Sequence, residues 1–185
     1  MNPQERQTVL DQFAAGESRL LALAEGLTQE QWNFRQNPER WSIAEIFEHV
    51  ILVERRVMGG MQKRLASGAP ATESPGNAAR DSELASKVRT RTQKIQAPEP
   101  VRPSGQWSAS DLSAGFRKTR ANSISFASAT TGNLRGYFMN HIAFGDIDCY
   151  QWLIVLAGHT ERHAQQIEEI KSDPAFPGKS SYAQA

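Results

Sequence analysis

The chain has 185 residues, of which 39% are hydrophobic and 22% charged, values typical of a single globular domain. Its 21 basic and 20 acidic residues leave a formal net charge of +1 without a clear basic block, which argues against binding to nucleic acid or to a membrane surface. The single cysteine, Cys149, rules out an internal disulfide and any multi-cysteine metal cluster, so metal chemistry would have to use histidine and carboxylate.

The N-terminal segment lacks the features of an export signal. Residues 1–17 carry charged side chains among the apolar ones, whereas a signal peptide has an uncharged apolar core. The longest strongly apolar run, 152–158, is far too short to span a membrane. We therefore expect a cytoplasmic protein.

Helical periodicity dominates the first part of the chain. One apolar stripe predicts a helix that ends near residue 27, and a short helical turn is expected from Thr28 before the break at Asn37-Pro38. A second helix begins after Ser42, which forms a capping box with Glu45. The two stripes are Val9, Phe13, Gly16, Leu20, Leu23 and Leu27, and then Ile46, Val50, Val53, Val57, Met61 and Leu65.

The segment 67–107 is predicted to be a long crossover. It begins with loop-forming residues, continues with a polar stretch from Asp81 to Lys94 that has almost no apolar face, and ends in a proline-rich part. Because it cannot bury a core of its own, we interpret it as a connection between the two ends of a helical bundle.

Two more helices follow the crossover. The third begins at a capping box of Ser108 and Asp111, and the fourth is expected to be capped by Asp146 after a short apolar segment, 137–145. The inward residues of the third helix are Leu112, Phe116, Thr119, Ser123 and Phe126. These patterns predict an all-α fold, a four-helix bundle in one domain over 1–178, with a loose tail at 179–185.

Three histidines are expected on inward helical faces. His159 and His163 lie four residues apart on the fourth helix, so their rings share one face, and His49 lies on the inward face of the second. Imidazoles from two facing helices can hold a metal ion inside a bundle. Three structural histidines, each hydrogen-bonded to its own partner, are the alternative interpretation.

Several known site types fail by single residues. The two zinc-protease patterns H-E-x-x-H and H-x-x-E-H would need glutamate at Thr160 or Arg162. A ferritin-like di-iron site would need glutamate three residues before a histidine, and no histidine here has one. Cys149 is about 15 Å of helical rise from His159, so we interpret it as a packed small residue.

Three motifs occur in order along the chain: Trp41-Ser42-Ile43-Ala44-Glu45-Ile46 with Glu48-His49, then Asn140-His141-x-x-Phe144-Gly145, then Trp152 followed by His159-x-x-Arg162-His163-x-x-Gln166-Ile167. Together they resemble the DinB/YfiT-like superfamily of bacterial four-helix-bundle metalloproteins. The resemblance implies one fold over almost the whole chain, a homodimer, and a divalent metal, zinc or nickel, held by His49, His159 and His163.

The middle motif departs from the family pattern. Relatives often have proline after its histidine, where this chain has Ile142. We interpret His141 as a loop or pocket-rim residue that is not a ligand. Gln166 is expected either to point its amide at the site or to pack against it, and Arg162 either to bind a substrate anion or to be a solvated surface charge.

Two enzymatic functions and one non-catalytic function are consistent with such a site. A metal-dependent thiol S-transferase would bind the thiolate of a low-molecular-weight thiol and deliver it to a small electrophile. A metal-dependent hydrolase would use metal-bound water and a general base, for which Glu45, one turn before His49, is the best candidate, either as base or as a partner of that ligand. The third is a metal-binding stress-response protein without catalysis. Thiol transfer is favoured for two reasons: a metal-bound thiolate needs no separate base, and the family that the chain resembles includes thiol-dependent S-transferases.

Overall fold

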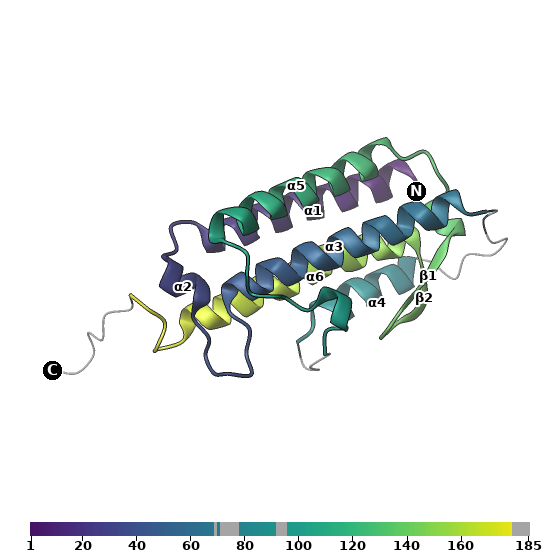
Figure 1. The fold of residues 1–185 in the computed structure, drawn as a ribbon. Helices are drawn as coiled ribbons and strands as arrows, with labels where there is room; N and C mark the ends of the chain where they lie inside the picture. Colours follow the sequence, from purple (N-terminus) through teal and green to yellow (C-terminus); the bar gives the residue numbers. More distant parts are fainter. Residues whose placement is uncertain (69, 71–77, 92–95, 179–185) are drawn as a thin grey trace.

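Four long helices form the body of the protein in the computed structural model, which describes residues 1–68, 70, 78–91 and 96–178 (Figure 1). They are α1 (Pro3–Ala24), α3 (Ile43–Ala66), α5 (Ala109–Ala129) and α6 (Cys149–Ser172). Helices α1 and α3 each pack against both α5 and α6. The predicted four-helix bundle is confirmed, and the short turn after Thr28 is α2 (Gln29–Asn33).

The connection between α3 and α5 returns the chain to the end of the bundle at which α3 begins, so α3 and α5 run in the same direction (Figure 1). It contains α4 (Ala78–Arg89) and the short 3-10 helix η1 (Glu99–Val101). Although the sequence of α4 shows almost no apolar face, it buries Leu84 and Val88, and it packs along α6. Residues 69, 71–77 and 92–95 of the predicted crossover, and the predicted tail 179–185, lie outside the described residues.

Helix α3 has the start that its sequence predicts. Ser42 accepts a hydrogen bond from the Glu45 backbone N–H, and the Glu45 carboxylate accepts one from the Ser42 N–H at 2.9 Å. This capping box fixes the first turn of α3 and therefore the position of His49 two turns later.

The expected start of the last helix is wrong. Residues Phe138–His141 and Gly145–Asp148 form an antiparallel hairpin, β1 and β2, and Asp148 caps α6 in place of Asp146. Gly145 adopts a positive φ of 68° just after the turn, and Asp146 is bound within the hairpin by Asn140. The chain therefore stays extended for two more residues before the helix begins.

The centre of the bundle contains a charged pair that the apolar stripes did not predict. Glu54 on α3 and Arg120 on α5 are almost fully buried, and Arg120 Nη2 lies 2.9 Å from Glu54 Oε2. The guanidinium also donates to Thr160 Oγ1 on α6 at 2.6 Å and lies over the ring of Phe13 on α1. All four helices of the bundle thus contribute to its surroundings.

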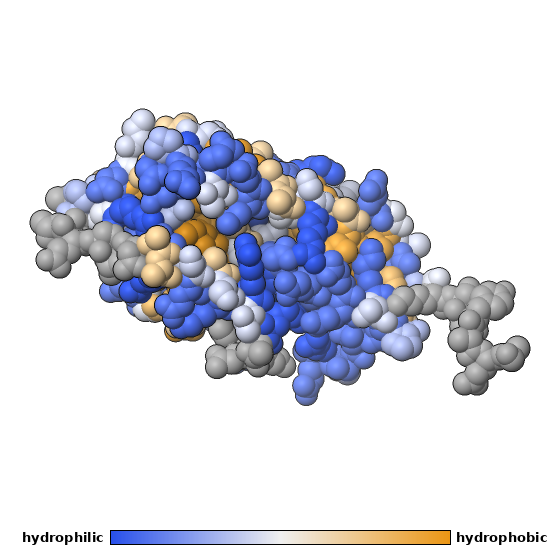
Figure 2. All heavy atoms as spheres, turned by 180° about the vertical axis from the view of Figure 1, so that it is seen from behind, coloured by the Kyte–Doolittle hydropathy of each residue, from blue (hydrophilic) through white to orange (hydrophobic). Residues whose placement is uncertain are grey.

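The outer surface is mostly hydrophilic in the view from behind, with smaller apolar areas (Figure 2). Ile142, in the turn between the two strands, is 71% exposed. Within the described ranges, no helix is both long enough and apolar enough to cross a membrane.

Candidate metal centre

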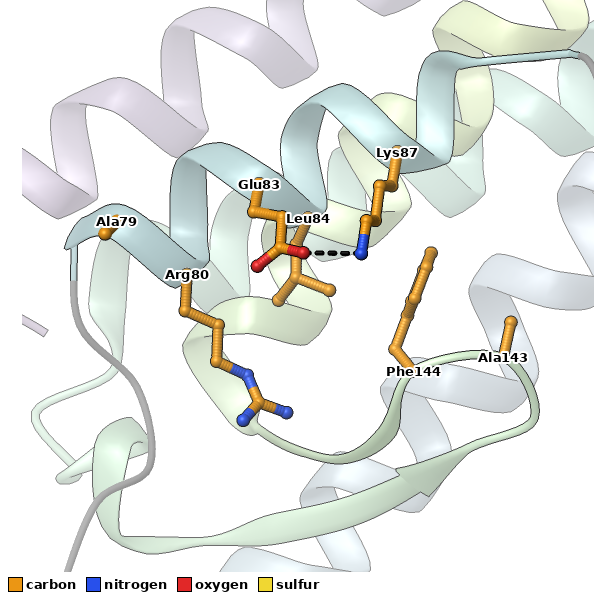
Figure 3. Close-up of a pocket in the computed structure, with 7 residues that line it drawn as sticks. All are labelled: Ala79, Arg80, Glu83, Leu84, Lys87, Ala143 and Phe144. Carbon is orange, nitrogen blue, oxygen red and sulfur yellow. Dashed lines mark ion pairs between the residues drawn. The ribbon is translucent and has the colours of Figure 1, made fainter.

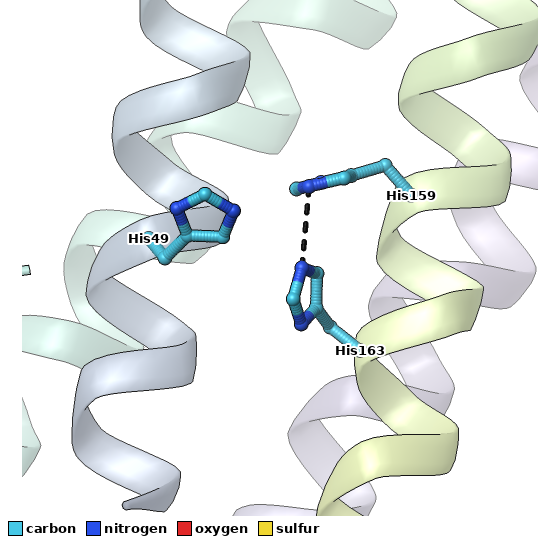
Figure 4. Close-up of side chains that lie close together, drawn as sticks. All are labelled: His49, His159 and His163. Atoms are coloured by element: carbon cyan, nitrogen blue, oxygen red, sulfur yellow. Dashed lines mark hydrogen bonds between the residues drawn. The ribbon is translucent and has the colours of Figure 1, made fainter. Parts of the chain in front are cut away.

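His49, His159 and His163 come together between α3 and α6, with His49 facing the two histidines of α6 (Figure 4). One ring nitrogen of each lies within 4.8 Å of those of the other two. The Nε2 atoms of His159 and His163 are 3.2 Å apart. His49 and His163 are buried, and His159 is half-buried.

The orientation of His49 is fixed by the crossover. Its Nδ1 lies 2.7 Å from the backbone carbonyl oxygen of Val101, at the end of η1. Because a carbonyl only accepts hydrogen bonds, Nδ1 carries the proton and Nε2 keeps its lone pair. The ring of Trp41 packs against His49 with centroids 4.7 Å apart, which further restricts the imidazole.

The orientation of His163 depends on Gln166, whose role the sequence left open. His163 Nδ1 lies 3.0 Å from Gln166 Oε1, and the same oxygen accepts a hydrogen bond from Arg91 Nη1 at 3.3 Å. Since arginine has only donors, this atom is the amide oxygen, and His163 donates to it. The Gln166 amide therefore points at the site, and His163 Nε2 carries no proton and keeps its lone pair.

The cluster favours neutral imidazoles. Burial lowers the pKa of His49, and burial together with the neighbouring histidines lowers the pKa of His159 and His163 well below 6.5. Neutral rings are the form that binds metal ions.

The spacing of His159 and His163 fits two ligands of one divalent cation. Tetrahedral coordination at 2.0–2.1 Å places ligand nitrogens about 3.3 Å apart, close to the 3.2 Å between His159 and His163. The same distance also fits an N–H···N hydrogen bond from His159 to His163. The arrangement thus accommodates both interpretations of the histidines, and a metal ion at this site is a proposal.

The two glutamates of α3 near His49 are engaged elsewhere. Glu45 Oε1 accepts a hydrogen bond from Arg35 Nη2 at 2.6 Å, and Glu45 Oε2 accepts one from the Ser42 N–H. No hydrogen bond joins it to a histidine among the described residues, so the structure gives no support for Glu45 as a general base.

Glu48, whose role could not be read from the sequence, holds the loop after η1 in place. Its Oε1 accepts from the N–H and hydroxyl of Ser104, and its Oε2 from the Gly105 N–H at 2.8 Å. By fixing this loop, it supports the carbonyl that orients His49. In the sequence, the only indication of this role is that Glu48 directly precedes His49.

His141 is not part of the three-histidine group. It is the last residue of β1, its Nδ1 accepts the Ala143 N–H at 3.0 Å, and its ring stacks on Phe144 and packs against Trp152. Burial lowers its pKa to about 4.

Two other residues considered in the sequence, Arg162 and Cys149, are engaged in the packing of the fold. Arg162 donates to the backbone carbonyl of Thr90, so it contacts the end of α4 and is not a fully solvated charge. Cys149 is fully buried, and burial raises the pKa of its thiol to about 12, which agrees with a packed, unreactive residue.

A separate open cleft of about 470 Å³ lies between α4 and the turn of the hairpin (Figure 3). Leu84 and Phe144 supply its apolar part, while Arg80, Glu83 and Lys87 supply charge. None of the three clustered histidines lines it.

The fold and site define a class: a four-helix bundle with a three-histidine cluster between α3 and α6. The sequence profile of the DinB superfamily matches residues 12–167, and the chain belongs to this superfamily. The family that the motifs predicted is thereby confirmed.

Two proteins of Bacillus subtilis are similar to this chain. YuaE from strain 168, described as an uncharacterized protein, is 24% identical over 150 residues, which cover 79% of this chain and 86% of YuaE. YfiT shares the fold with a TM-score of 0.64 at 13% identity, over 92% of this chain and 88% of YfiT. The YfiT structure is described as "a probable metal-dependent hydrolase with an unusual four-helix bundle topology".

Proposed function

We propose that the chain is a metal-dependent enzyme that holds one divalent ion, zinc or nickel, with His49, His159 and His163. The observation that carries the proposal is the convergence of three imidazoles whose pKa values are lowered by burial. In the described part of the chain, no carboxylate is hydrogen-bonded to any of them. The description of YfiT as a probable metal-dependent hydrolase supports a metal-dependent function.

A divalent ion bound there would act as a Lewis acid and lower the pKa of a water or thiol bound to it. We propose that the nucleophile is the thiolate of a low-molecular-weight thiol, which attacks a small electrophile. The new bond joins sulfur to the electrophilic atom, and the leaving group departs with the electron pair of the broken bond. The proton of the thiol would be released to solvent when the thiol binds the ion, so transfer of this kind needs no carboxylate base.

The surroundings of the two nearby carboxylates support the choice of a thiol. A hydrolase has to deprotonate water and commonly uses a positioned carboxylate for it. Glu45 is held by Arg35 and Ser42, and Glu48 by Ser104 and Gly105. Neither carboxylate is available beside the histidines. Hydrolysis is the second candidate, because it is the activity in the description of YfiT.

The experiment that separates these functions offers 1-chloro-2,4-dinitrobenzene and 4-nitrophenyl acetate to the metal-loaded protein. Each is assayed with and without bacillithiol, mycothiol or glutathione. We expect turnover that requires a thiol and is lost in His163→Ala. Ester turnover that ignores the thiol would reject the transferase in favour of hydrolysis. Stoichiometric metal without any turnover would favour a non-catalytic metal-binding protein.

A further inference from the structure

The proposed metal ligands from α3 and α6 obtain their hydrogen-bond partners in different ways. His49 donates directly to a backbone carbonyl of the crossover, at Val101. His163 donates to a side chain of its own helix, Gln166, whose amide can rotate and offer either its oxygen or its NH2 group. If the NH2 group faced His163, Nδ1 would have to accept, and the proton would move to Nε2. Something must therefore select the amide oxygen.

Arg91, in the crossover just after α4, contacts this amide. Its Nη1 donates to Gln166 Oε1 and to the backbone carbonyl oxygen of Arg162, both at 3.3 Å. A guanidinium cannot accept a hydrogen bond, so the Gln166 NH2 group cannot face it without leaving two donors opposed. With the oxygen shared by Arg91 and His163, the proton of His163 is held on Nδ1.

The guanidinium is itself held firmly. Its Nε and Nη2 bind both carboxylate oxygens of Glu169 on α6, at 3.0 and 2.7 Å, and its side chain is only 19% exposed. Bidentate pairs of this kind fix the plane of the guanidinium. Nearby, Val88 of α4 lies directly against Gly158 of α6, next to His159. The end of α4 and the residues just after it are therefore docked on the same turns of α6 that carry the proposed ligands.

We propose that Arg91 is a positioning residue, which fixes the Gln166 amide and so holds His163 in the tautomer whose Nε2 can bind a metal ion. The inference rests on the proposed metal site for its effect on affinity. Its structural part, the tautomer of His163, belongs to the metal-free protein and can be measured without metal.

The test compares wild type with Arg91→Met, using Arg89→Met as the matched control because Arg89 is an exposed arginine at the end of α4, two residues before Arg91. In the metal-free protein, the 15N NMR shifts of His163 should report protonated Nδ1 and unprotonated Nε2. Arg91→Met should populate the other tautomer, and Arg89→Met should not. Gln166→Leu, which removes the acceptor and leaves Arg91 paired with Glu169, should have the same effect as Arg91→Met.

The second readout is the dissociation constant for Zn2+, measured by competition with a chelating dye. Loss of a hydrogen bond that orients a ligand typically weakens metal binding about 10–100-fold, and we expect a loss in this range for Arg91→Met and Gln166→Leu. Unchanged tautomer and unchanged affinity in Arg91→Met, whatever the result for Gln166→Leu, would overturn the role of Arg91. A wild-type protein that binds no Zn2+ would instead overturn the proposed function, and the NMR comparison would still decide whether Arg91 positions His163.

Discussion

At the scale of single residues, the site depends on which nitrogen of each imidazole carries the proton. The Val101 carbonyl and the Gln166 amide oxygen hold the proton of His49 and His163 on Nδ1. His141 is held the other way, since its Nδ1 accepts the Ala143 N–H. Burial then favours the neutral form of all four rings by lowering their pKa values.

His141 is expected to make the stability of the fold depend on pH, and this contribution can be measured separately by replacing His141. Its pKa is about 4 in the folded protein and close to 6.5 in the unfolded chain, so between these values the unfolded state binds more protons. Its contribution to stability is complete above pH 6.5 and is lost as the pH falls toward 4. We expect the urea midpoint of metal-free protein to fall from pH 7.5 to 5.0, and to fall less in His141→Asn. Equal pH slopes in the two proteins would contradict this. The raised pKa of Glu54 acts in the opposite direction, but it is common to both.

The residues that the sequence predicted for the site are those whose spacing follows a helix. His159 and His163 share a face because they are four apart, and the stripe around Ile46 and Val50 turns His49 inward. The groups that orient them were not predictable. Val101, which contacts His49, lies 52 positions after it, and Arg91, which contacts Gln166, lies 75 positions before it. Both come from the crossover, and helical periodicity carries no information about such contacts.

At the scale of elements, the docking of α4 on α6 depends on one glycine. A Cβ atom at Gly158 would overlap Val88 Cγ1. Glycine within a helix normally costs about 1 kcal/mol relative to alanine, so its presence here follows from the close approach of α4. The sequence of α4 alone did not reveal this, because two buried apolar residues, Leu84 and Val88, are too few to make a stripe.

Gly158→Ala should therefore destabilise the protein despite its better helix propensity. We expect a loss of about 1–3 kcal/mol, typical of overpacking. The Val88→Ala change removes the overlapping methyl group, so the double variant should be no less stable than Val88→Ala alone. Urea unfolding of the four proteins forms a double-mutant cycle. Additive losses would show that the two residues do not meet.

The hairpin of β1 and β2, like α4, has too short a sequence to show a clear period. Its strands have four residues each, and their burial does not alternate in a clear period of two. The apolar run 137–145 was thus equally consistent with a loop. Two aspartates, Asp146 and Asp148, were available as caps, and the pairing of Asn140 with Asp146 keeps the chain extended until Asp148.

At the scale of the whole molecule, a buried ion pair joins the helices of the bundle. Burial raises the pKa of Glu54 and lowers that of Arg120, and their mutual attraction opposes both shifts. Within the described residues, Arg120 Nε and Nη1 have no hydrogen-bond partner. Such a pair contributes little net stability, but losing one member leaves the other charge buried and alone.

Arg120→Met should accordingly cost about 3–5 kcal/mol of unfolding free energy. Replacing both members, as in Glu54→Met with Arg120→Met, should recover most of that loss, because no unpaired charge remains. Chemical denaturation at pH 7.5 measures both variants. A double variant as unstable as Arg120→Met alone would show that the pair itself stabilises the bundle.

The fold of the whole chain was the most predictable feature. Periodic apolar stripes and capping residues marked the helices, and the three motifs indicated the superfamily that the sequence profile identifies. What could not be predicted is the path of the crossover over α6, since its polar sequence has no period and its position depends on contacts such as Val88 with Gly158.

The central claim is that His49, His159 and His163 hold a divalent ion, and metal content measures it most directly. Protein purified without chelators is analysed by inductively coupled plasma mass spectrometry alongside His163→Ala and His141→Ala. We expect about one zinc or nickel ion per chain in wild type and in His141→Ala, and loss of the ion in His163→Ala. Equal metal content in wild type and His163→Ala would contradict the claim.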